Sequence, residues 1–130
     1  MREILFRGKK TGFNEWVYGL IYSEDNTIFV LKEINHKIEW YVDADTIGQY
    51  TGLTDKNGKK IFEGDIVAGA ASWQGIRKNG VVAFREGSFG LIWYRGEIEQ
   101  FNPFPCMCNI EYEVIGNIHD NPELLKGGVE

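Results

Sequence analysis

Apolar residues recur along the chain in short runs, and Gly, Asn and Asp interrupt these runs at close intervals. Runs of about four to eight residues with alternating or continuous apolar character are typical of β-strands. The pattern predicts strands over residues 4–7, 16–22, 27–31, 38–42, 47–53, 65–68, 80–84, 89–94 and 112–118. So many short strands predict an all-β (mainly β) fold, built as a small barrel or as packed sheets.

The connections between these strands carry turn residues. Residues 23–26 and 85–88 are predicted to form hairpin turns, because Ser, Asn, Asp and Gly favour turn conformations. The strongest turn signal is Asn57-Gly58, since a tight turn needs positive φ angles, which glycine adopts without strain. Asp55 is expected to initiate this turn.

The C-terminal half of the chain resembles an SH3-like barrel, in which a diverging turn precedes two long hairpin strands. The resemblance rests on the apolar runs at residues 64–67, 80–84 and 89–93. It divides a single domain over residues 1–130 into an N-terminal β meander, residues 1–60, and an SH3-like part, residues 61–126. Residues 69–79 would then form a long loop that contains Trp73.

One short C-terminal helix is predicted over residues 121–126. Asn121 is a suitable cap, Pro122 fits the first helical position, and Glu123 complements the positive end of the helix dipole. The glycine pair that follows is expected to end the helix.

The segment from Gln49 to Val67, QYTGLTDKNGKKIFEGDIV, resembles the signature of the YopX family. That family contains small β-rich proteins of Gram-positive bacteria and their phages. Residues 2–7, REILFR, are similar to the family's basic-aromatic opening strand, and residues 113–125, EVIGNIHDNPELL, are similar to its end. The resemblance spans nearly the whole chain and implies a phage- or prophage-encoded protein.

The family has no established biochemical activity and no agreed catalytic residues, so the resemblance assigns no site. Residues 27–45 and 69–79 are the least family-like parts of the chain. Any specificity peculiar to this member could lie there.

Length and composition favour one globular domain. A chain of 130 residues is long enough to bury one core and short for two independent domains. Its 43% hydrophobic and 25% charged residues are ordinary for a soluble protein. No apolar run approaches the roughly 20 residues that span a bilayer, and residues 1–10 lack the apolar stretch of a signal peptide. The expected location is the bacterial host cytoplasm.

The net charge of −5 argues against a general nucleic-acid coat, because binding a polyanion needs a dense positive surface. Three basic groups could still converge into one patch, although each is also typical of solvated strand ends and loops. They are Arg2 and Arg7 with Lys9 and Lys10, then Lys56 with Lys59 and Lys60, and finally Arg77 with Lys78.

A metal site is not expected. Cys106 and Cys108 could supply two thiolate ligands, but a structural zinc site usually needs four ligands at other spacings. His36 and His119 would both have to reach the same loop to complete the set. The two cysteines are interpreted as ordinary thiols in a reducing compartment.

No catalytic residue and no cofactor is predicted. His119-Asp120 offers a base beside a carboxylate, but sequence neighbours generally point apart, so His119 is interpreted as a surface or capping residue. Glu63 and Asp65 could form a paired acid on one side of a strand. The preferred interpretation is that Asp65 fixes a turn by hydrogen bonding to nearby backbone N–H groups. No common nucleotide or hydrolase motif occurs.

Aromatic residues make up 14% of the chain, and most are expected to pack in the core or across strands. Trp73, Phe101 and Phe104 instead lie in predicted loops, where an aromatic side chain can anchor a partner. The candidate partner-binding residues are Trp73, Arg77, Lys78, Tyr94, Phe101 and Phe104.

The sequence therefore favours a non-enzymatic accessory protein that acts by contact with an unknown host or phage protein and by homo-oligomerisation. The alternative is a nucleic-acid-binding module that uses an SH3-like barrel face, with Trp73, Arg77, Lys78 and Tyr94 as its contact residues. The acidic charge disfavours that alternative.

Overall fold

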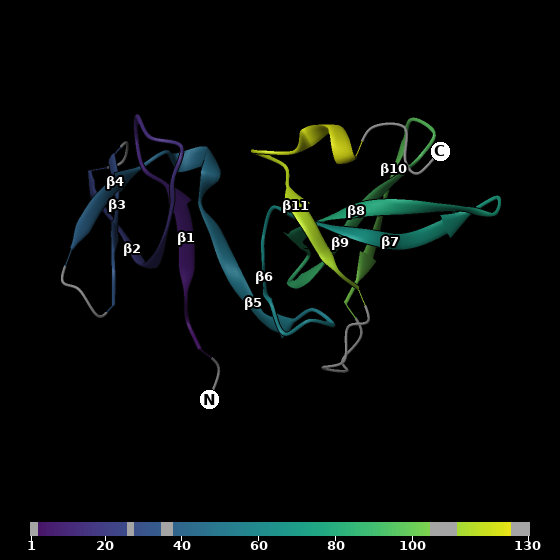
Figure 1. Cartoon of the computed structure of the whole chain (residues 1–130), viewed down its shortest axis with the longest axis horizontal. Coiled ribbons are helices and arrows are strands. Elements are labelled where there is room, and N and C mark those ends of the chain that lie inside the picture. Colours follow the sequence, from purple (N-terminus) through teal and green to yellow (C-terminus); the bar gives the residue numbers. More distant parts are fainter. Residues whose placement is uncertain (1–2, 26–27, 35–37, 105–111, 126–130) are drawn as a thin grey trace. The chain divides into compact units, whose positions relative to one another are not determined.

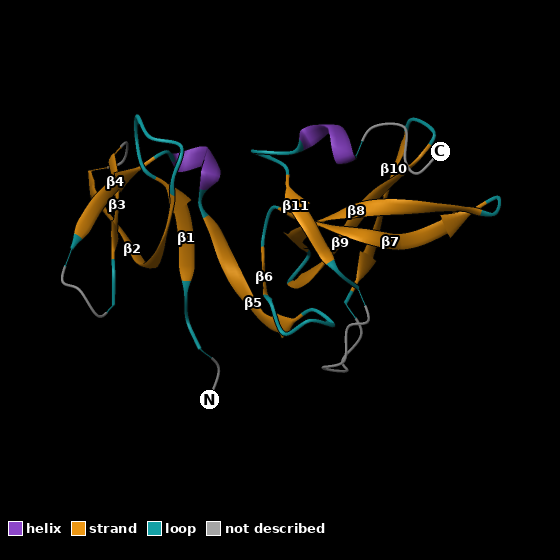
Figure 2. Ribbon diagram, viewed as in Figure 1, coloured by secondary structure: helices purple, strands orange, loops and turns teal. Residues whose placement is uncertain are grey.

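A computed structural model describes residues 3–25, 28–34, 38–104 and 112–125 of the chain. Strands dominate these residues, and the only helical elements among them are two single turns of 3-10 helix (Figures 1 and 2). The predicted all-β class is therefore confirmed. Contacts within the chain divide it into two compact units, Met1–Gly52 and Leu53–Glu130.

The first sheet has the strand order β4-β3-β2-β1-β5-β6, with antiparallel pairing along β4, β3, β2, β1 and β5. Its strands are β1 (Phe6–Lys9), β2 (Trp16–Asp25), β3 (Ile28–Lys32), β4 (Glu39–Val42), β5 (Gly48–Thr54) and β6 (Lys60–Phe62). The 3-10 turn η1 (Ala44–Thr46) joins β4 to β5. An isolated bridge pairs Lys10, just after β1, with Val42 at the end of β4.

The alternating residues of β2 form two different surfaces of this sheet. Val17 is buried with Leu31 and Val42, and Ile21 packs against that cluster. Gly19, on the same side as Val17 and Ile21, lies against β3. A Cβ atom at Gly19 would come within 2.0 Å of the Lys32 carbonyl oxygen, so only glycine allows the two strands to pair here.

The second sheet has the strand order β10-β9-β8-β7-β11, and all of its pairs are antiparallel. Its strands are β7 (Asp65–Trp73), β8 (Ile76–Arg85), β9 (Ser88–Arg95), β10 (Ile98–Pro103) and β11 (Val114–Asn117). Its core is formed by Ile61, Val67, Val82, Leu91 and Val114, with Leu53, Phe104 and Tyr112 packed against them.

The Asp55 carboxylate holds the turn before β6. Its Oδ1 accepts hydrogen bonds from the backbone N–H groups of Asn57 and Lys59, both at 2.9 Å, and its Oδ2 accepts one from Val114 N at 3.0 Å. Gly58 closes the turn with φ +83°. The predicted roles of Asp55 and of the Asn57-Gly58 pair are confirmed.

Asp65 also has the structural role predicted for it. Its buried carboxylate accepts a 2.8 Å hydrogen bond from Phe62 N across the tight turn between β6 and β7. Gly64, in the same turn, has φ +89°, and its N–H donates to the Val82 carbonyl. The side chain of Asp65 is therefore used to fix the backbone.

All nine predicted strands overlap an observed strand, and both predicted hairpins are present. The turn at 85–88 is closed by Glu86 and Gly87, which have φ +52° and +82°. The other hairpin joins β2 to β3, and its residues 26–27 lie outside the described residues. Strands β6 and β10 were not predicted.

The prediction of a long loop over residues 69–79 is wrong. Strands β7 and β8 continue through this segment to a two-residue turn at Gln74 and Gly75, whose φ angles of +52° and +77° suit a tight hairpin. A bulge between Val67 and Ala71 contains Gly69, which has φ +61°. Gly69 therefore belongs to a bulge within a strand, although a glycine at this position in the sequence also predicts a loop.

The predicted barrel and C-terminal helix are not observed in the described residues. Both sheets are open, and the C-terminal segment forms only the 3-10 turn η2 (Pro122–Leu124). Asn121 makes no side-chain cap bond. Its Oδ1 instead accepts a 3.3 Å hydrogen bond from Asn117 N, so the preceding turn uses the side chain that was expected to cap a helix.

Replacing Gly58 by Val should lower the free energy of unfolding by about 1–2 kcal/mol, because a β-branched residue is strained at positive φ. No other atom lies within 4 Å of the added Cβ, so the loss would come from the backbone alone. Gly58→Asn, which tolerates this conformation better, is the matched control. Thermal melts of both variants check this expectation, and a Val variant that melts with the parent would contradict it.

The Asp55 network should make the protein sensitive to acid. Burial raises the pKa of Asp55, but the N–H groups of Val114, Lys59 and Asn57 and the Lys59 charge lower it more, so it lies below its ordinary value of 3.8. A lowered folded-state pKa stabilises the fold above the unfolded pKa, and this contribution disappears as the pH falls through the folded pKa.

Asp55→Ala should therefore lower the free energy of unfolding by about 2–4 kcal/mol at pH 7, because it leaves the buried N–H group of Val114 and the part-buried N–H groups of Asn57 and Lys59 without an acceptor. The difference from the parent should shrink below about pH 4. Denaturant unfolding at several pH values measures it, with Asp43→Ala as a control that removes an exposed carboxylate. A difference that does not change with pH would argue against the network.

Candidate functional site

The sequence-predicted residues Trp73, Arg77 and Lys78 lie on a projecting part of the second unit. We call residues 69–79, the end of the β7–β8 hairpin, the arm. Figure 1 shows its turn extending beyond the other strands of that unit. Trp73 pairs directly with Ile76, and alternation along β8 places Lys78 on their face and Arg77 on the opposite face.

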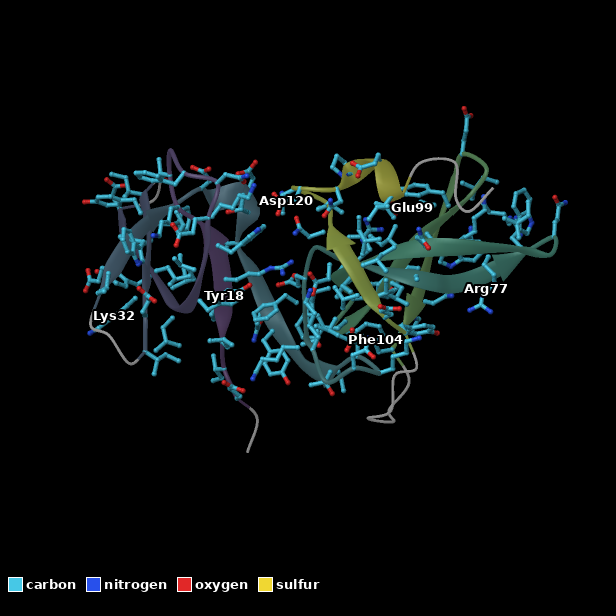
Figure 3. The ribbon with its side chains drawn as sticks, in the orientation of Figure 1. Tyr18, Lys32, Arg77, Glu99, Phe104 and Asp120 are labelled. Carbon is cyan, nitrogen blue, oxygen red and sulfur yellow. The ribbon has the colours of Figure 1, made fainter. Side chains whose placement is uncertain are left out.

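The arm holds Arg77 in a defined position. Its Nη2 atom donates a 2.8 Å hydrogen bond to the Gly69 carbonyl across the hairpin. A Cβ atom at Gly69 would come within 2.7 Å of the same nitrogen, so glycine is required for this contact as well as for the backbone angle. Figure 3 shows Arg77 on the side of the hairpin.

The other three predicted residues lie on β9, on β10 and directly after β10. Tyr94 is partly exposed on β9. Phe101 lies in strand β10, not in a loop, and covers Gly90, where an added Cβ would come within 2.6 Å of its ring. Phe104 (Figure 3) packs against the core of the second unit, and its N–H donates to the Phe89 carbonyl. The roles of these residues in binding stay predictions.

The first unit also has a groove that the sequence did not predict. Its volume is about 560 Å³. We call it the groove, and it is lined by Lys10, Thr11, Phe13, Ile28, Phe29, Trp40, Tyr41, Val42, Asp43 and Ala44. Most of this lining is apolar or aromatic, which is typical of surfaces that receive a ligand or a partner side chain.

Backbone hydrogen bonds assemble the groove from segments far apart in the sequence. Thr11 N donates to the Tyr41 carbonyl at 2.9 Å, and Asp43 N donates to the Lys9 carbonyl at 2.9 Å. A turn follows, in which Phe13 N donates to the Lys10 carbonyl and leaves the Phe13 ring 67% exposed. The loop after β1 is thus fixed against β4, with an aromatic side chain at the rim.

Lys10 is part of the groove wall, and its charge is compensated. Its ammonium nitrogen lies 3.4 Å from the centre of the Trp40 ring and 3.0 Å from Glu15 Oε1. A cation over an indole face is favourable, and the lysine stem adds apolar surface. The Trp40 indole N–H donates to Glu33 Oε2 at 2.7 Å, which fixes the ring.

The remaining charge in the groove belongs to Asp43. Its side chain is exposed and has no cation partner among the described residues. The groove therefore combines an apolar wall with one uncompensated carboxylate. This arrangement suits an apolar partner that also carries a positive charge.

A second apolar surface lies on the outer face of β2, where Tyr18, Leu20 and Tyr22 alternate with the buried residues and are each more than 40% exposed. Beside them, the guanidinium carbon of Arg7 lies 4.6 Å from the centre of the Trp16 ring. Sequence reasoning expected most aromatic residues to pack in the core or across strands, and it did not predict this exposed face. The signal was present, because β2 is apolar at both odd and even positions.

The residues that the sequence offered for metal and acid–base chemistry lie partly outside the described residues. Among the described residues, no group of three or more His, Cys, Asp or Glu side chains could hold a metal ion. Cys106, Cys108 and His36 lie outside the described residues. The N–H groups of His119 and Asp120 both donate to Asn117 Oδ1, so this pair belongs to a turn (Figure 3).

No helix in the described part of the chain is long and apolar enough to cross a membrane.

A family model and a solved structure match this chain. The model of the family described as YopX protein matches residues 5–126. A solved structure, "Crystal structure of protein EF1440 from Enterococcus faecalis", is similar to this chain with 27% identity and a TM-score of 0.58. That similarity covers 97% of this chain and 100% of the other. No curated protein matches.

Proposed function

This chain belongs to the YopX family, and we propose that it is a phage- or prophage-encoded accessory protein that acts by protein–protein contact. In this proposal the protein binds copies of itself as well as a host or phage protein, and it catalyses no reaction. The groove of the first unit is the observation that carries the proposal.

The size and lining of the groove support protein binding. Its volume of about 560 Å³ falls within the roughly 300–1,000 Å³ of surfaces that take up drug-sized groups. Phe13, Trp40 and Tyr41 provide aromatic contact area, and such residues are enriched where proteins bind each other. A partner's apolar side chains would displace water from this wall.

Exposed apolar side chains outside the groove support self-association. Tyr18, Leu20 and Tyr22 on β2 and Ile76 on the arm all contact solvent. Soluble proteins rarely leave large contiguous apolar surfaces uncovered, and a closed symmetric oligomer would cover them.

A second candidate function, nucleic-acid binding, has one observation in its favour. The chain has no Asp or Glu between Asp65 and Glu86, and this stretch contains Arg77, Lys78 and Arg85. A two-stranded β-ribbon can enter the major groove of DNA. The net charge of −5 opposes such binding, so protein contact is the preferred function.

Self-association predicts a particle mass above the 14.9 kDa of one chain. Light scattering behind a sizing column at micromolar protein concentration measures this mass. Leu20→Ser, Tyr22→Ser and Ile76→Ser each remove one exposed apolar side chain, and at least one of them should lower the mass without changing the melting temperature. A parent protein that stays monomeric at high concentration would overturn the proposed self-association.

Duplex DNA should bind more weakly than about 10⁻⁴ M at physiological salt, which is the weak end of non-specific affinity. Fluorescence anisotropy with a labelled duplex tests this expectation. Micromolar binding that weakens steeply with added salt, and that Arg77→Ala with Lys78→Ala abolishes, would instead favour the nucleic-acid function.

A further inference from the structure

We infer that the groove of one copy receives the arm of a second copy. The inference rests on the proposed self-association and names the two surfaces that make the contact. It follows from the chemistry of the groove and of the arm, which complement each other in polarity and charge.

The tip of the arm is narrow and apolar. Trp73 and Ile76 form the last pair before the two-residue turn, and their side chains lie on one face. Ile76 is 43% exposed and Trp73 is half-buried, so the tip presents apolar surface to solvent. The groove offers a wall of the same character, with Phe13, Phe29 and Trp40 among its lining residues.

The charges of the two surfaces are opposite. Arg77 and Lys78 stand directly behind the tip, and neither has a carboxylate partner among the described residues. The groove presents the carboxylate of Asp43, while its lysine is already paired with Glu15 and stacked on Trp40. An arm inserted tip first would bury its apolar pair and place a cation near Asp43.

A contact of this kind is heterologous, because each copy contributes a different surface to it. Every copy then has one arm to donate and one groove to fill, and repeated contacts produce a closed ring or an open chain. A face-to-face contact of two β2 surfaces would instead be isologous and would stop at a dimer. The two arrangements can be distinguished by mixing variants.

The experiment uses one variant of each surface in the full chain. Ile76→Asp places a charge on the arm tip, and Phe13→Asp places a charge on the groove rim, where the native ring is 67% exposed. Ile98→Asp is the matched control, because Ile98 is an exposed apolar residue on β10, outside both the arm and the groove. Melting temperatures verify that all three fold, and Ile76→Ser with Phe13→Ser replaces any Asp variant that does not.

We expect each of the two variants to raise the dissociation constant of self-association by at least about tenfold, because each places a carboxylate against the apolar surface that the contact would bury. The control should leave it unchanged. An equimolar mixture of the two variants should recover association but stop at twice the 14.9 kDa chain mass. In that mixture only the intact arm of one variant and the intact groove of the other can combine.

Three results would overturn the inference. Both variants could associate as the parent does, which would assign the contact to another surface and leave self-association intact. Each variant could dissociate without recovery in the mixture, which would exclude an arm-to-groove pair. A parent that is monomeric at every concentration would overturn the inference together with the proposed self-association.

Discussion

The second unit depends on the carboxylate of Asp55, which accepts hydrogen bonds from backbone N–H groups in two segments that are far apart in the sequence. Two of its hydrogen bonds close the turn before β6, and the third reaches Val114 N, 59 residues further along the chain. Val114 then lies in the same buried cluster as Ile61, which follows the turn. One side chain thus fixes a local turn and the position of the last strand. The bond from Val114 N is buried and those from Asn57 and Lys59 are part-buried, so the carboxylate satisfies donors that have little access to water.

The sequence predicted local features well where one residue type has one physical role. Gly58 was recognised because few other residues adopt a positive φ without strain, and Asp65 because a carboxylate beside glycine bonds to nearby N–H groups. The hydrogen bond from Val114 N to the Asp55 carboxylate was not predictable, because the sequence around Asp55 does not indicate which distant N–H group will be buried beside it. The strands of the arm were missed because Gly69 and Gly75 resemble loop residues until their backbone pairing is known.

The groove illustrates a different limit of sequence reasoning. Lys10 was assigned to a basic group at a solvated strand end, but the bridge between Lys10 and Val42 brings its stem onto Trp40. That bridge joins residues 32 positions apart. Seven of the ten residues that line the groove fall within residues 27–45, and the arm is residues 69–79. Both segments lie outside residues 2–7, 49–67 and 113–125, on which the resemblance to the family was based.

Gly69 has an effect on recognition that goes beyond the shape of the bulge. Its carbonyl already binds the guanidinium of Arg77, so the long arginine side chain is ordered before any partner arrives. A free arginine loses considerable rotamer entropy when a carboxylate immobilises it, and a pre-organised one loses much less. The rotamer entropy of Arg77 is therefore lost on folding and not on binding. An anion that binds here contacts a guanidinium whose orientation is already set by the Gly69 carbonyl. Such a donor favours a carboxylate that arrives along this direction, because following one from another angle would break its bond to the Gly69 carbonyl.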